Sequence, residues 1–206
     1  MADVYLASRS PRRRELLKQI GVRFEPLMLR LARPRGADVD EALQPGESAG
    51  DYVERIAREK AEYGVRVVAM RTMLAKPILS ADTVVILDGE VLSKPQSTAQ
   101  ATDFLRRLSG RTHEVRTAVA VTAGQPNSVK ILSAVSISEV TLRALDPGEI
   151  ARYCATGEPH DKAGGYAIQG LAAVFVERIN GSYSGVMGLP LFETAALLRQ
   201  AGIGVL

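Results

Sequence analysis

The feature that most constrains the fold lies near the start of the chain, where a short apolar segment leads into a polar turn and then into an amphipathic helix. Residues 4–7 predict a buried strand. Ser10 followed by Pro11 is typical of a helix N-terminus, because serine caps the first turn and proline lacks an N–H that the helix does not need there. Gly21 predicts the end of this helix. We therefore expect a tight strand–turn–helix unit at residues 4–21.

The turn of this unit carries the chemistry of an anion-binding site. It offers the hydroxyls of Ser8 and Ser10, backbone N–H groups at the positive end of a helix, and four arginines, Arg9 and residues 12–14. These groups predict a site for a phosphate chain. The alternative is a capped helix with a solvated basic first turn. Arginine there opposes the helix dipole, so the alternative gives no reason for the cluster.

The rest of the chain predicts an α/β fold with a mixed, twisted central sheet flanked by helices, forming two lobes around a cleft. Asn180-Gly181 predicts a hairpin, Thr98 predicts a helix cap, and Asp146-Pro147 with Glu149 predicts the first turn of another helix. The 206 residues suit a single domain, 1–206, with the section at about 95–155 as a candidate smaller lobe. Further strands are expected at 22–29, 78–87, 112–123, 128–141 and 173–179, and helices near 49–63, 98–108, 147–154 and from 190.

Composition constrains the expected location of the protein more than its activity. No apolar run approaches membrane-spanning length, and arginines interrupt any signal-peptide pattern near the N-terminus, so we expect no membrane association. The single cysteine, Cys154, cannot form an internal disulfide, which fits a cytoplasmic protein. A net charge of +3 suits an anionic small molecule as well as weak nucleic-acid contact, and it decides between neither.

Asp82 is the clearest candidate for chemistry. It interrupts an otherwise apolar predicted strand, where a carboxylate is costly unless it is paired, hydrogen-bonded or bound to a metal. The alternative is that the strand emerges there and Asp82 caps a turn. Thr83 would point to the opposite face and could simply be a β-branched strand residue.

Several other charged residues have both a functional and a structural explanation. Lys60 lies on the apolar face of the predicted 49–63 helix, where a snorkelling lysine is usual, and Lys94 precedes a proline that often only ends a strand. Either lysine could neutralise phosphate. The acidic loop with Asp38, Asp40 and Glu41 is either solvated or contributes, with Asp82, to an oxygen-rich Mg²⁺ or Mn²⁺ site.

A second dense cluster spans residues 161–170. Its paired glycines allow close approach to a ligand, and Gln169 offers the donor and acceptor that suit a nucleobase edge. A tight structural turn is the alternative. His113 and His160 are too few and too scattered for a zinc centre. The chain also lacks a phosphate loop and a G-x-S-x-G elbow, which argues against a Walker-type ATPase and a serine hydrolase.

Taken together, these segments resemble the Maf family of nucleoside triphosphate pyrophosphatases. The resemblance covers nearly the whole chain in order. The motifs that carry it are LASRSPRR (residues 6–13), SADTVV (80–85), KP (94–95), LSG (108–110), DKAGGYAIQG (161–170), GSYS (181–184) and GLPL (188–191). The sequence at 165–170 is similar to that of the branch acting on dTTP and UTP.

The resemblance implies hydrolysis of the α–β phosphoanhydride to a monophosphate and pyrophosphate, with a divalent cation, Mg²⁺ or Mn²⁺. It implies Asp82 as the catalytic base and, with Glu41, as a metal ligand, and Asp161 as a weaker candidate metal or structural acid. A homodimer is a further implication. The remaining implied residues are Arg12, Thr83 and Gln169 for specificity, and Ser8, Arg13, Lys60 and Lys94 for phosphate.

A competing interpretation is a non-enzymatic regulator of cell division that binds nucleotides or nucleic acid. Only the basic N-terminal turn favours it. The chain has few aromatic residues for base stacking and no long basic stripe, so we expect no stable nucleic-acid binding. A nucleotide kinase is a poorer alternative, because the phosphate loop is missing.

Overall fold

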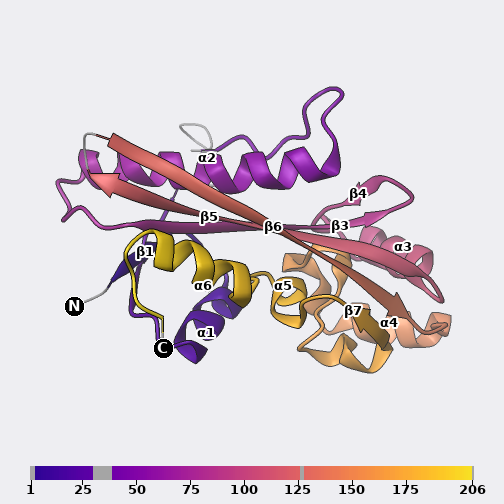
Figure 1. Cartoon of the computed structure of the whole chain (residues 1–206). Coiled ribbons are helices and arrows are strands. Elements are labelled where there is room, and N and C mark those ends of the chain that lie inside the picture. The colour runs from indigo at the N-terminus through magenta and orange to yellow at the C-terminus, as the bar shows by residue number, and fades with distance from the viewer. Residues whose placement is uncertain (1–2, 30–38, 126–127, 206) are drawn as a thin grey trace. The chain divides into compact units, whose positions relative to one another are not determined.

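The computed structural model describes residues 3–29, 39–125 and 128–205, and Figure 1 traces the path of the chain. The predicted acidic residue Asp38 lies outside the described residues. The chain divides into two compact units. Unit 1 comprises Met1–Asp82, Thr117–Val135 and Gly188–Leu206, and unit 2 comprises Thr83–Arg116 and Ser136–Met187. The expected lobe at about 95–155 is shared between them and stays a prediction.

Strand pairing in the described chain gives a seven-stranded mixed sheet. The strands are β1 (Val4–Leu6), β2 (Phe24–Pro26), β3 (Ile78–Leu87), β4 (Glu90–Leu92), β5 (Thr112–Gln125), β6 (Ser128–Leu142) and β7 (Val176–Asn180). Their order is β2-β1-β3-β5-β6-β7, with β4 added to β3. Strand β1 is parallel to β2 and β3, whereas β3 with β4 and β6 with β7 are antiparallel pairs. The predicted mixed α/β class is confirmed.

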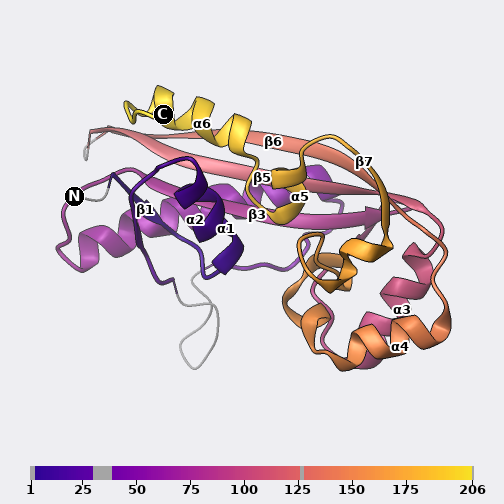
Figure 2. The same cartoon turned by 90° about the horizontal axis from the view of Figure 1, so that it is seen from below.

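Unit 1 packs helices on both faces of its strands. Helix α2 (Ala49–Met70) lies on one face, and α1 (Pro11–Gln19) and α6 (Leu191–Gln200) lie on the other (Figures 1 and 2). Helix α2 lies close to β3 at Gly64, where an added Cβ would be 2.9 Å from a side-chain carbon of Ile78. The buried Ser80 hydroxyl also donates to the Ala57 carbonyl at 2.6 Å. These contacts fix α2 on the strand that carries Asp82.

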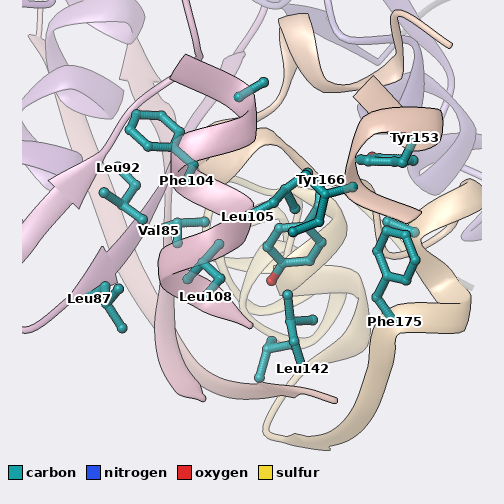
Figure 3. Packing of buried hydrophobic residues seen from close by; sticks show 14 of the residues in the cluster. Val85, Leu87, Leu92, Phe104, Leu105, Leu108, Leu142, Tyr153, Tyr166 and Phe175 are labelled. Atoms are coloured by element: carbon teal, nitrogen blue, oxygen red, sulfur yellow. The ribbon is translucent and has the colours of Figure 1, made fainter. Parts of the chain in front are cut away.

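Unit 2 has an apolar core of its own, which Figure 3 shows from close by. Leu105 and Leu108 enter it from α3 (Thr98–Leu108), Tyr153 from α4 (Pro147–Ala155) and Leu142 from β6. Tyr166 is buried in the same cluster. The remaining elements of unit 2 are α5 (Tyr183–Met187) and the 3-10 helices η1 (Glu158–Asp161), η2 (Ala163–Gly165) and η3 (Leu171–Phe175).

Several predicted elements are confirmed with small shifts. Strand β3 spans the predicted 78–87, and Asp146 and Glu149 form a reciprocal capping box at α4. Helix α2 continues beyond the predicted residue 63 to Met70, and the predicted strand 22–29 is reduced to Phe24–Pro26. Among the described residues, no helix is both long and apolar enough to traverse a lipid bilayer.

Three local predictions were wrong. Ser97, not Thr98, caps α3, because its side chain accepts from the Gln100 N–H. The predicted strand 173–179 begins only at Val176, after the 3-10 helix η3. Asn180-Gly181 does not form a hairpin but leads into α5. An added Cβ at Gly181 would lie 2.6 Å from the Ser138 Oγ, so the glycine serves a close approach to β6.

Candidate active site

A buried lysine joins two carboxylates in unit 1. The Nζ atom of Lys60, on α2, lies 2.8 Å from Oδ1 of Asp82 on β3 and 2.6 Å from Oε1 of Glu41. Lys60 is only 7% exposed. The predicted strand acid is therefore paired rather than capping a turn, and the predicted acidic loop reaches it through Glu41. We call Glu41, Lys60 and Asp82 the acid–lysine cluster.

The electrostatics of the acid–lysine cluster keep its lysine charged. Burial alone would lower the pKa of Lys60, but the charges of Asp82 and Glu41 and their hydrogen bonds raise it above the ordinary value. The lysine is therefore an ammonium at neutral pH. In this low-dielectric position it offsets the repulsion between two carboxylates that share its Nζ atom.

Sequence reasoning missed Tyr52, which lies about two helical turns before Lys60 on α2. Its hydroxyl donates to the Glu41 carbonyl at 2.9 Å. Burial, together with the charges of Asp82 and Glu41, raises the pKa of Tyr52 to about 12, so the phenol stays protonated. Tyr52 thus attaches the Glu41 loop to α2. The helical spacing from Lys60 was the only signal that could have found it.

The arginine-bearing turn also belongs to unit 1. The Ser8 hydroxyl accepts from the Ser10 N–H at 3.2 Å and from Nη1 of Arg13 at 3.2 Å. Nε of Arg13 donates to the Gly188 carbonyl at 2.7 Å. Burial lowers the pKa of Arg13, while the charge of Asp82 opposes that shift. The turn is therefore electrostatically coupled to the acid–lysine cluster.

The structure separates the predicted site residues by unit. Those of unit 1 are Ser8, Arg12, Arg13, Glu41, Lys60 and Asp82, and those of unit 2 are Thr83, Lys94, Asp161 and Gln169. In unit 2, Lys94 and Gln169 are exposed, and Thr83 follows Asp82 along β3 with a half-buried side chain. Asp161 is exposed and forms an ion pair with the neighbouring Lys162.

The donor set of unit 1 suits a hard divalent cation. Magnesium is commonly bound by one or two carboxylates together with substrate phosphates, and Glu41 and Asp82 provide two carboxylates on one lysine. Within the described ranges, no group of three or more His, Cys, Asp or Glu side chains is placed to hold a metal ion. Phosphate oxygens have the right chemistry to complete the shell of an ion held by these two carboxylates.

Comparisons with known proteins agree on one family. The family model described as Maf-like protein matches residues 3–201. A protein of Aromatoleum aromaticum named dTTP/UTP pyrophosphatase is 54% identical over 202 residues, covering 98% of this chain and 96% of that protein. Proteins with the same name from Nitrosomonas europaea and Nitrosospira multiformis are 52% and 54% identical over 202 residues, each covering 98% of this chain and 96% of the relative.

Proposed function

Because this chain belongs to the Maf family, we propose that it hydrolyses the α–β phosphoanhydride bond of dTTP and UTP to the nucleoside monophosphate and pyrophosphate. The observation that carries the proposal is the acid–lysine cluster beside an arginine-bearing helix start, both in unit 1. Phosphoryl-transfer enzymes work mainly by positioning and by neutralising charge, and this arrangement supplies both kinds of group.

Asp82 is the proposed catalytic residue. Its carboxylate orients and deprotonates the attacking water or holds a metal ion, and one carboxylate can do both. Lys60 keeps Asp82 in place through the 2.8 Å contact and faces the phosphates as a cation. Ser8, Arg12 and Arg13 bind phosphate oxygens at the start of α1, where the helix dipole also favours negative charge.

The roles of the unit 2 residues rest on the family resemblance. Lys94 is the proposed further phosphate ligand, and Thr83 and Gln169 are the proposed readers of the pyrimidine edge, with Arg12 as a third specificity residue. The exposed amide of Gln169 offers a donor and an acceptor, which supports this role. A missing partner for one base hydrogen bond costs about 1–3 kcal/mol, so one residue can set a substantial preference.

The proposed cofactor is Mg²⁺ or Mn²⁺, held by Glu41 and Asp82, with Asp161 as a further candidate. When bound, such an ion would polarise the phosphate oxygens and neutralise their charge. Lys60 would then share the two carboxylates with the ion. We further propose a cytoplasmic homodimer without stable nucleic-acid binding, and light scattering after size-exclusion chromatography would test the dimer.

The decisive experiment incubates the protein with dTTP or UTP and Mg²⁺ or Mn²⁺ in ¹⁸O-labelled water. We expect monophosphate and pyrophosphate in equal amounts, with the label in the monophosphate because water attacks the α-phosphorus. Chelator and Asp82→Asn serve as controls. Direct release of orthophosphate would mean that a different bond is cut. Nucleotide binding without turnover would instead favour the non-enzymatic regulator.

A further inference from the structure

A single carboxylate in unit 2 ties together three segments of the chain. Oε1 of Glu158, in η1, accepts from the Tyr153 hydroxyl of α4 at 2.9 Å and from the Ala172 N–H at 3.5 Å, while Oε2 accepts from the Leu171 N–H at 3.1 Å. The last two donors are the first residues of η3, whose N–H groups have no partner within the helix. Glu158 therefore caps η3 and fastens it to α4.

The same carboxylate lies against Gly170, the residue before η3. A Cβ added at Gly170 would be 2.5 Å from Oε1 and 2.5 Å from Oε2 of Glu158. Real Cβ atoms do not come so close to another atom, so either the carboxylate or the loop would have to move. The glycine thus lets the backbone approach the carboxylate, and the residue held directly beside this contact is Gln169.

The segment on the other side of Gln169 is also fastened within unit 2. The Gly164 N–H donates to the Ser93 carbonyl at 3.2 Å, and a Cβ at Gly164 would be 2.9 Å from the Val85 side chain. The Tyr166 hydroxyl lies 2.7 Å from Nε2 of the buried His113, and its ring is packed in the core (Figure 3). Gln169 is thus an exposed residue between two anchored segments.

We propose that Glu158 is a positioning residue for Gln169. By fixing the position of the Gln169 side-chain amide, Glu158 sets the base preference of the enzyme. This inference rests on the proposed function, in which Gln169 reads the base. Gln169 itself lies in a connection between 3-10 helices, so its position depends on the anchors at either end. Of these anchors, the contact between the Glu158 carboxylate and Gly170 lies next to Gln169 in the chain.

The Tyr153 hydroxyl keeps its proton for this contact. Burial, together with the hydrogen bond to Glu158, raises the pKa of Tyr153 above its ordinary value. Tyr153 therefore remains a donor at neutral pH. Tyr153→Phe removes one of the three hydrogen bonds at the carboxylate and leaves those from Leu171 and Ala172, which makes it a milder variant than Glu158→Ala.

The first test compares kcat/KM for dTTP, UTP, dCTP and dGTP across variants. Glu158→Ala should lower the preference for dTTP over dCTP about tenfold through a raised KM, because a misplaced contact group weakens recognition. Its kcat should stay within about threefold, since the chemical step does not use Glu158. Tyr153→Phe should give a smaller change. Glu90→Gln, which neutralises a carboxylate paired with Arg107 elsewhere in unit 2, is the matched control and should change nothing.

The second test is a double-mutant cycle with Gly170→Ala. Gly170→Ala should reduce the base preference through its clash with the carboxylate. In the Glu158→Ala background the clash is gone, so the added methyl should have little further effect. Fully multiplicative effects would mean that Gly170 does not act through Glu158, and would overturn the proposal.

Gln169→Ala separates the failure of this inference from the failure of the proposed function. If Gln169→Ala flattens the base preference and a folded Glu158→Ala keeps it within about twofold, positioning by Glu158 is refuted and base reading by Gln169 stands. If Gln169→Ala leaves the preference unchanged, base reading fails and the inference falls with it. Should Glu158→Ala not fold, Glu158→Asp takes its place in both tests, because the shorter side chain withdraws the carboxylate from Gly170 and from the first residues of η3.

Discussion

The candidate site residues of unit 1 differ from those of unit 2 in what holds them in place. In unit 1, Lys60 is held by ion pairs at 2.6 and 2.8 Å with two carboxylates. In unit 2, Gln169 is neutral and exposed, and the segments on either side are held by the Glu158 carboxylate, backbone hydrogen bonds, glycine contacts and a buried tyrosine. Ion pairs thus hold a site residue directly in unit 1, whereas in unit 2 contacts to the neighbouring segments hold Gln169 in place. Substitutions in the acid–lysine cluster should therefore impair turnover, and substitutions around Gln169 should impair selectivity.

The largest effect is expected from Asp82→Asn. Loss of the carboxylate should lower turnover of dTTP by about a thousandfold, within the range seen for removal of a general base. The variant loses one ion pair, but it keeps the size of the side chain and Lys60 keeps its contact with Glu41, so it should stay folded, and a circular dichroism spectrum checks that. Measured pyrophosphate release checks the first expectation. Near-normal turnover by a folded variant would mean that Asp82 takes no part in the chemistry. The acid–lysine cluster of unit 1 would then not account for turnover.

Lys60→Met should reduce both turnover and stability, because it leaves two carboxylates without their shared cation. We expect turnover about a hundredfold lower and a free energy of unfolding lower by about 3 kcal/mol, as for other broken buried ion pairs. Denaturant titration measures the second quantity. Lys18→Met, at an exposed position of α1 in the same unit, is the control. Adding Asp82→Asn to Lys60→Met should recover part of the stability, and an unchanged Lys60→Met protein would contradict the pairing.

The pH dependence of stability tests whether the apolar core of unit 2 requires His113 to be neutral. Burial lowers the pKa of His113 from 6.5 to about 4. Between these values the unfolded chain binds a proton that the folded chain does not, so stability falls as the pH is lowered. From pH 7 to pH 5 this should cost about 2 kcal/mol of unfolding free energy. The unfolding free energy of His113→Gln should fall by about 2 kcal/mol less than that of the unaltered protein over the same interval. Equal pH dependence of the two proteins would refute the assignment of this pKa to His113.

The smallest effect concerns the helix starts of unit 1. Ser48 accepts from the Asp51 N–H at 3.2 Å, whereas Ser10 makes no such cap hydrogen bond although it occupies the N-cap of α1. Ser48→Ala should therefore lower the free energy of unfolding by about 1 kcal/mol, and Ser10→Ala by clearly less. Equal losses in denaturant titrations would mean that Ser10 caps α1 in solution.

Features set by neighbouring residues were mostly predictable from the sequence, with the Ser97 cap of α3 as an exception, and those set by distant contacts were not. The apolar run of β3 and the Asp146 cap of α4 are local patterns, and both were predicted correctly. The 3-10 helix η3 depends on Glu158, which is distant in the sequence from the N–H groups it accepts. Gly181 was wrongly predicted to form a hairpin because its close approach to Ser138 is not visible locally.

The candidate site shows the same division. Asp82 stood out because a carboxylate in an apolar strand needs a partner, but Lys60 could not be identified as that partner from the sequence. The pairing depends on how α2 packs on β3 through Gly64 and Ser80. Tyr52 was missed for the same reason, since its bond is to a loop carbonyl. The roles of Thr83, Lys94 and Gln169 came from resemblance and stay predictions.

The ammonium group that lies between Glu41 and Asp82 has a consequence for how the protein would respond to its surroundings. Because the chain supplies its own counter-ion, these acids need no external cation to tolerate each other. The acid–lysine cluster can therefore keep its arrangement when no divalent ion is bound. With the proposed divalent cofactor, activity would then follow the supply of the ion on the timescale of diffusion rather than of refolding.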